Sequence, residues 1–131
     1  MVPNPTNYDN WMVADAISLS SSLCTVAIVG VNLGTQNPAG IIAYDSNKRL
    51  WTNSSWRCSN TLESGWTTAG FDDSAWPAAK SQFSYGNGAW GTNAGLTAGS
   101  NVYWIWTSGL DNKGNPSDSV VYCRILTGIA L

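Results

Sequence analysis

Tandem carboxylates, Asp72 and Asp73, lie between large aromatic residues: Phe71 precedes them directly, Trp66 lies upstream and Trp76 downstream. Such a pair could act as general acid and base, bind calcium or accept hydrogen bonds from sugar hydroxyls. Adjacent carboxylates on one turn point apart, however, whereas those of a glycosidase face each other at roughly 5–10 Å. We therefore expect a structural corner, in which one carboxylate caps a turn while Phe71 and Trp76 face the core.

A segment rich in glycine and asparagine at 85–95 is the best candidate for binding a ligand. Its composition predicts a surface loop, in which Trp90 lies with Tyr85, Asn87 and Asn93. A sugar is bound by stacking its C–H face on an aromatic ring while amides bond its hydroxyls, and loops at the end of a sandwich can bring such groups together. The alternative is that Trp90 closes one end of the core, since large aromatic side chains are mostly buried.

Few residues are suited to catalysis. The chain has no histidine, no nucleophile elbow and no phosphate-binding loop, and its single glutamate, Glu63, lies in a polar turn. Arg57 and Arg124 are expected to brace strands or carboxylates rather than to anchor a substrate. The sequence therefore predicts a protein that is not an enzyme.

The loop at 111–118 (DNKGNPSD) has a faint likeness to a calcium-binding loop. Asp111 and Asn115 stand at its first and fifth positions, but Lys113 occupies the third and no bidentate acid stands at the twelfth. A zinc site is not expected either, because the cysteines are too widely spaced and histidine is missing. We expect no metal and no cofactor, since no motif supplies the further oxygens that a structural calcium ion would need.

The composition is that of one turn-rich domain with few charges. Charged residues make up 11% of the 131 residues, against about 25% in average proteins, which suits an extracellular β protein. The net charge of −2 and the dispersed basic residues argue against nucleic acid as a partner. No run approaches the roughly 20 apolar residues that span a bilayer, so membrane insertion is not expected. The first residues lack a signal-peptide pattern, which predicts a mature form or a fragment.

Strands rather than helices are predicted to position these residues. The clearest is 23–31 (LCTVAIVGV), which is apolar on both sides and is therefore expected in the middle of a sheet covered on both faces. A hairpin is expected from 41–45 to 50–52, and further strands at 103–106 and 120–127. Short strands separated by turns, without a helix longer than about two turns, predict an all-β sandwich or jelly roll.

Six segments carry a likeness to a known fold: 25–29, 39–43, 51–58, 65–77, 104–106 and 121–124. In these segments the chain resembles the galactose-binding-domain-like jelly rolls of extracellular and cell-surface proteins, some of which are lectins and carbohydrate-binding modules. The resemblance implies a single jelly-roll β-sandwich at 11–131, preceded by an extended arm at 1–10. Its motifs are fairly specific to the fold and poorly specific to any ligand.

Four residues are open to covalent linkage. The three cysteines, Cys24, Cys58 and Cys123, allow one bridge. Cys58 and Cys123 fall on expected strands with apolar neighbours, and the resembling modules often hold cysteines at both places, which implies a core disulfide between them. Cys24 would then be a buried thiol or bridge to another chain. Asn53 begins an N-glycosylation acceptor sequence (NSS), which matters only in a eukaryotic secretory pathway.

The resemblance is incomplete at the N-terminus, because nothing before Trp11 matches the hairpin with which such modules usually begin. A missing strand leaves an unpaired sheet edge, which residues 1–10 or a neighbouring chain would fill. Two functions follow from the sequence. The first is a non-catalytic, extracellular module that binds a glycan near Trp90. The alternative is a structural subunit that forms an oligomer or filament through its N-terminal arm or an open sheet edge.

Overall fold

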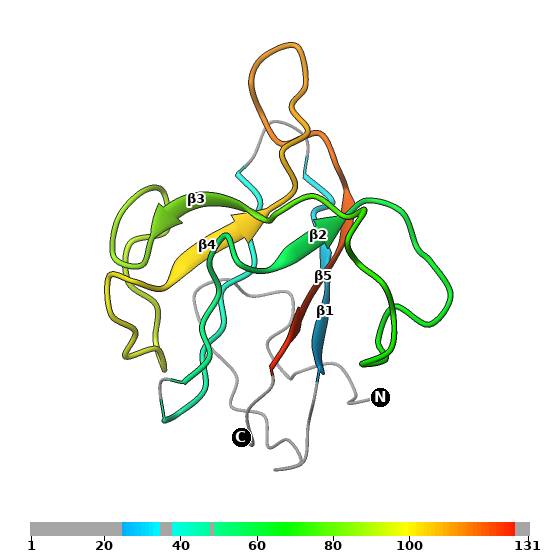
Figure 1. Cartoon of the computed structure of the whole chain (residues 1–131). Coiled ribbons are helices and arrows are strands. Elements are labelled where there is room, and N and C mark those ends of the chain that lie inside the picture. The colour runs from blue at the N-terminus through cyan, green and yellow to red at the C-terminus, as the bar shows by residue number, and fades with distance from the viewer. Residues whose placement is uncertain (1–24, 35–37, 48, 128–131) are drawn as a thin grey trace.

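The computed structural model describes residues 25–34, 38–47 and 49–127, and this part of the protein is all-β, as expected (Figure 1). The strands are β1 (Thr25–Val31), β2 (Arg57–Ser59), β3 (Lys80–Ser84), β4 (Tyr103–Trp106) and β5 (Val120–Leu126). They form two antiparallel sheets, one with the order β1-β5-β2 and one of β3 and β4. The described residues include no helix, and so none of the length and hydropathy needed to cross a bilayer. The predicted arm at 1–10 and Cys24 lie outside these residues.

The larger sheet has β5 at its centre, with β1 on one side and β2 on the other. The central, doubly covered place was expected for 23–31 instead. Within the described residues, however, β1 pairs with β5 alone, and its Val29 and Val31 are 50% and 58% exposed. Coverage of both faces is therefore not seen at these two residues, because β-branched residues favour a strand whether or not both of its faces are covered.

The two strands of the smaller sheet run across the view in Figure 1, whereas β1 and β5 of the larger sheet run along it. Strand β4 confirms the prediction at 103–106, and Ile41 extends the smaller sheet through paired backbone hydrogen bonds of 2.9 Å to Ile105. Strand β3 was not predicted, because its sequence (KSQFS) has one apolar residue and no regular alternation. Its pairing with β4 is irregular between Ser81 and Ser84.

The hydrophobic core brings residues of the two sheets together. Ile105 and Trp106 of β4 are 0% and 1% exposed, and they belong to the same buried cluster as Val121 of β5. Gly30 of β1 lies directly against them: a Cβ atom placed on it would be 2.6 Å from the Trp106 ring and 2.8 Å from Ile41. The missing side chain therefore lets β1 approach the smaller sheet.

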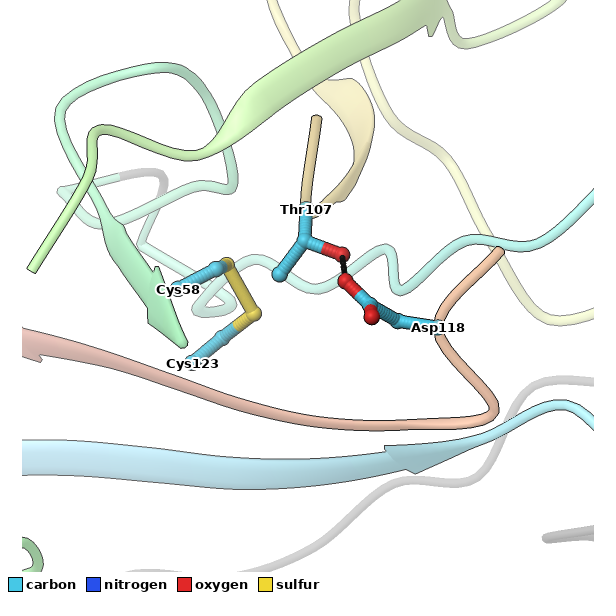
Figure 2. The surroundings of a disulfide bond; sticks show 4 residues. All are labelled: Cys58, Thr107, Asp118 and Cys123. Atoms are coloured by element: carbon cyan, nitrogen blue, oxygen red, sulfur yellow. Dashed lines mark hydrogen bonds between the residues drawn. A yellow bond between two sulfur atoms is a disulfide. The ribbon is translucent and has the colours of Figure 1, made fainter. Parts of the chain in front are cut away.

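A disulfide between Cys58 and Cys123 joins β2 to β5, which confirms the implied pairing (Figure 2). Close to it, the Thr107 hydroxyl donates a hydrogen bond to the carboxylate of Asp118. The Asn60 amide donates to the other carboxylate oxygen at 3.1 Å. These contacts tie the start of β5 to the ends of β4 and β2, so that both sheets are linked beside the disulfide.

The corner at 66–77 covers the other face of the larger sheet. Trp66 packs edge-on against Tyr122 of β5 with ring centroids 5.3 Å apart, and Trp76 stacks on Trp66 at 6.3 Å. In Figure 1 this loop projects beyond β2 and β5, away from β3 and β4. The corner thus packs as a structural element, as its aromatic residues predicted.

Candidate functional site

A pair of aromatic side chains on the hairpin at 41–52 lines a small open pocket. Tyr44 lies opposite Trp51, and the backbone hydrogen bonds flank this pair, from Asp45 to Leu50 and from Thr52 to Ala43, both at 2.9 Å. Residues paired in this way have the shorter Cα separation of an antiparallel ladder, so their side chains lie close together on one face. The hairpin prediction is confirmed, and the pairing places two half-buried rings side by side.

The loop at 97–102 supplies the rest of the pocket lining. Ala98, Gly99, Asn101 and Val102 line the pocket with the two aromatic residues and enclose about 110 Å³. A Cβ atom on Gly99 would come within 2.8 Å of the Asn101 side-chain oxygen, so the glycine leaves room for that amide. The turn is closed by a hydrogen bond of 3.1 Å from the Val102 amide to the Gly99 carbonyl.

The pocket is uncharged near neutral pH, because its lining holds no Asp, Glu, Lys, Arg or His side chain. The nearest charged residue along the hairpin is Asp45, which binds the turn. Burial raises the pKa of Asp45, but hydrogen bonds from the Leu50 and Arg49 amides and the Arg49 side chain outweigh this and lower it overall. The pocket therefore offers aromatic faces, an amide and backbone groups to a neutral ligand.

Trp90, the predicted stacking residue, lies in an aromatic cluster. Its ring is half-buried, 4.4 Å from that of Trp104 and 5.3 Å from that of Phe83 between centroids. A Cβ atom on Gly40 would be 2.9 Å from the Trp90 ring, so the indole packs directly on the backbone there. This position matches the alternative in which Trp90 closes one end of the core, although its half-exposed ring leaves the binding role a prediction.

The three polar residues predicted to accompany Trp90 all form hydrogen bonds within the protein, and two of them are buried. Tyr85 is 8% exposed, and its hydroxyl accepts a hydrogen bond of 2.8 Å from the Asn93 amide and lies 3.2 Å from the carbonyls of Asn93 and Leu96. Asn93 is itself 6% exposed. The Asn87 side chain donates to Ser84 at 2.8 Å. Tyr85 and Asn93 thus organise the loop from inside.

The corner carboxylates have separate structural roles. Asp72 accepts a hydrogen bond of 3.0 Å from the Ser74 amide, and the side-chain and backbone groups of Ser74 lower the pKa of Asp72. Asp73 pairs with the buried guanidinium of Arg124. The predicted capping by one of the two carboxylates is therefore seen at Asp72, whereas the role of Asp73 as an ion-pair partner adds to what the sequence indicated.

Other predicted polar residues also bind the protein itself. The Trp76 indole N–H donates to Glu63, and Arg57 donates to the Trp76 carbonyl at 2.8 Å. Asp111 accepts hydrogen bonds from the Asn115 and Lys113 amides, at 2.9 and 2.8 Å, which lower the pKa of Asp111. Among residues 25–34, 38–47 and 49–127, no three His, Cys, Asp or Glu side chains are grouped so that they could hold a metal ion.

Asn53, the predicted glycosylation acceptor, follows the hairpin directly. Its side-chain oxygen accepts hydrogen bonds from both the amide and the hydroxyl of Ser55. The residue is half-buried, while Ser54 and Ser55 are exposed. Glycosylation at this position stays a prediction.

Sequence reasoning missed Tyr44, Trp51 and Asn101 as a site. The hairpin itself was predicted, and its turn of four residues, 46–49, would have placed Tyr44 near Trp51 across the strands. No local pattern, however, indicates that a loop 50 residues further along the chain supplies the second wall.

The comparisons with known proteins give one distant similarity. An alpha-L-rhamnosidase of Streptomyces avermitilis is 29% identical to this chain over 96 residues. The matched region covers 68% of this chain but 9% of the relative, so the chain corresponds to a small part of a much longer protein. No family model and no solved structure matches the chain.

Proposed function

We propose that this protein is a non-catalytic, extracellular module that binds a neutral glycan in the pocket between Tyr44, Trp51 and Asn101. The observation that carries the proposal is the cross-strand aromatic pair that lines an uncharged pocket together with the Asn101 amide. Aromatic rings stack on the C–H faces of sugars, and amides can donate to and accept from hydroxyl groups. The proposed binding site is therefore at the hairpin at 41–52 and not, as the sequence predicted, at the loop around Trp90.

Two further observations support the proposal. The similarity to part of an alpha-L-rhamnosidase suggests a carbohydrate-related domain, and the all-β fold suits a galactose-binding-domain-like jelly roll. The Cys58–Cys123 disulfide is typical of proteins from oxidising compartments, which supports an extracellular location. We expect neither a metal nor a cofactor to be needed for binding.

The proposal is tested by titrating the protein with neutral monosaccharides, including L-rhamnose and galactose, and by screening a glycan array. Trp51→Ala should weaken binding about fivefold or more, because a stacked ring contributes on the order of 1 kcal/mol or more. Trp90→Ala is the matched control: it removes an indole outside the pocket and should leave the affinity unchanged in folded protein. Binding lost with Trp90→Ala but kept with Trp51→Ala would return the site to the loop at 85–95, and a wild-type protein that binds no glycan would refute the function.

A second candidate is self-association through β1. The strand (TVAIVGV) has no charged residue or proline, the features that usually protect sheet edges. Its Val29 and Val31 are exposed, and Leu33, just beyond it, is 91% exposed. A second copy of the chain, with its own β1 antiparallel to this one, would cover these residues symmetrically.

A further inference from the structure

Two tyrosine hydroxyls hold the loop between β3 and β4 at separate points. The buried Tyr85 hydroxyl binds the backbone of Asn93 and Leu96. The Tyr44 hydroxyl, on the hairpin at 41–52, accepts a hydrogen bond of 2.8 Å from the Thr97 amide and lies 3.2 Å from the Thr97 hydroxyl. The first attachment is buried, whereas the second is exposed to water.

The exposed attachment lies beside the proposed pocket. Thr97 is followed directly by the lining residues Ala98 and Gly99, and Asn101 comes two positions later. Tyr44 therefore takes part in the site twice: its ring lines the pocket, and its hydroxyl fixes the loop that supplies the rest of the lining.

We infer that Tyr44 is a positioning residue, whose hydroxyl acts through Thr97 to hold residues 97–101 in the arrangement that binds the glycan. This inference rests on the proposed function. When the loop leaves this arrangement, the Asn101 amide loses its place in the pocket, so the apparent affinity falls with the fraction of molecules in the binding arrangement. Because one hydrogen bond changes an equilibrium constant by about 2- to 12-fold, its loss lowers that fraction by up to the same factor.

The loop attachment is tested first in the free protein. In Tyr44→Phe, amide hydrogen exchange should become faster at 97–101, because the Thr97 amide loses its acceptor, while exchange at 93, held by Tyr85, should stay unchanged. Unchanged exchange at 97–101 would overturn the inference. This measurement needs no ligand, so it stands even if no glycan binds and the proposed function fails.

The effect on binding is tested with a double-mutant cycle. Tyr44→Phe should weaken glycan binding about 5- to 10-fold while keeping the aromatic ring. Thr97→Val keeps the backbone amide and removes only the hydroxyl contact with Tyr44, so it should weaken binding less than Tyr44→Phe does and add no further loss in Tyr44→Phe, where that contact is already gone. Thr92→Val, an exposed threonine earlier in the same loop, is the control and should have no effect.

Two results would contradict a positioning role. If Thr97→Val weakens binding equally in both backgrounds, Thr97 acts independently of Tyr44. If Tyr44→Phe weakens binding while exchange at 97–101 stays slow, the hydroxyl contacts the glycan directly.

Discussion

Arg124 brings a charge into the core and connects β5 to the corner at 66–77. It is 2% exposed, donates to the carbonyls of Trp66 at 2.9 Å and Thr68 at 2.8 Å, and pairs with Asp73. Its guanidinium also lies 5.3 Å from the centroid of the Phe71 ring. Each of the three guanidinium nitrogen atoms therefore donates a hydrogen bond that fixes the loop over the sheet.

We predict that Arg124→Met lowers the free energy of unfolding by about 3 kcal/mol or more, because it leaves Asp73 and two carbonyls without their donor. Arg57→Met is the control: that side chain donates to the Trp76 carbonyl from a half-buried position, so its loss should cost about 1 kcal/mol. Urea unfolding measures both. Equal losses would show that the buried pair adds nothing beyond an ordinary hydrogen bond.

The lowered pKa of Asp45 predicts a contribution to acid sensitivity. A carboxyl group whose folded-state pKa lies below its ordinary value stabilises the protein above that ordinary value. This contribution is lost as the pH falls through the lower folded-state value. Asp45→Asn, which keeps an oxygen acceptor but cannot titrate, should therefore reduce the fall in unfolding free energy between pH 5 and pH 3.

The matched control for this prediction is Ser46→Ala, in the same turn, which should leave the pH dependence as in wild type. If Asp45→Asn also retains the full wild-type dependence, Asp45 does not contribute to acid unfolding.

Single residues were predicted well where their role is local. The capping by Asp72 follows from residue type and the next two positions, and the bracing by Arg57 and Arg124 follows from the cost of leaving a buried cation without partners. The function of Tyr85 could not be predicted in this way. Its hydroxyl is used by backbone groups up to 11 residues away, and only the folded loop brings them together.

Among the secondary-structure elements, β2 is the shortest and depends most on its covalent link. It has three residues, and Cys58 at its centre is bonded to Cys123 at the centre of β5. The bridge closes a loop with a sequence separation of 65 residues, which includes the corner and the smaller sheet. Closing so long a loop restricts the unfolded chain considerably.

Replacing Cys58 and Cys123 together by alanine should lower the free energy of unfolding by about 4 kcal/mol in the chain-entropy model. Denaturant unfolding measures the change, and intact mass with and without reductant shows whether the bridge is present. Cys24→Ala is the control and should keep the mass difference of one disulfide. A double variant as stable as wild type would show that hydrogen bonding and packing alone hold β2 in place.

Strands were predictable in proportion to their apolar content. The strands β4 and β5 were expected from runs of β-branched and aromatic residues, and both are present. The polar sequence of β3 gave no such signal, because its one apolar residue, Phe83, cannot produce a regular alternation. The hairpin at 41–52 was predicted, but its role in a site was not.

At the scale of the whole molecule, the exposed face of β1 tests whether the chain associates with itself. If it does, Val29→Lys combined with Val31→Lys should convert the assembly to a monomer in size-exclusion chromatography with light scattering. Leu110→Lys, at a residue 61% exposed in the loop between β4 and β5, is the control and should leave the assembly intact. Deleting residues 1–10 distinguishes the two routes of association. The deletion should dissociate an assembly that forms by donation of the N-terminal arm and leave one that forms through β1 intact. A wild-type monomer at all concentrations would exclude self-association.

The order of the strands in the sheets could not be predicted from the sequence. The pattern of short strands predicted an all-β protein, but an apolar strand such as β1 reads the same at the centre of a sheet or at its side. The order β1-β5-β2 depends on contacts between residues about 60 to 100 positions apart. The pocket depends on the same kind of distant pairing, which is why its two walls could not be joined from local patterns.

The lack of a side chain at Gly30 should couple the evolution of three positions that are far apart in the chain, 30, 41 and 106. Since the Trp106 ring and Ile41 fill the space that a methyl group at position 30 would need, alanine can be accepted there only if one of them becomes smaller. In an alignment of related proteins, residue 30 should therefore vary together with residues 41 and 106. Such covariation would report the distance between the two sheets without any structure.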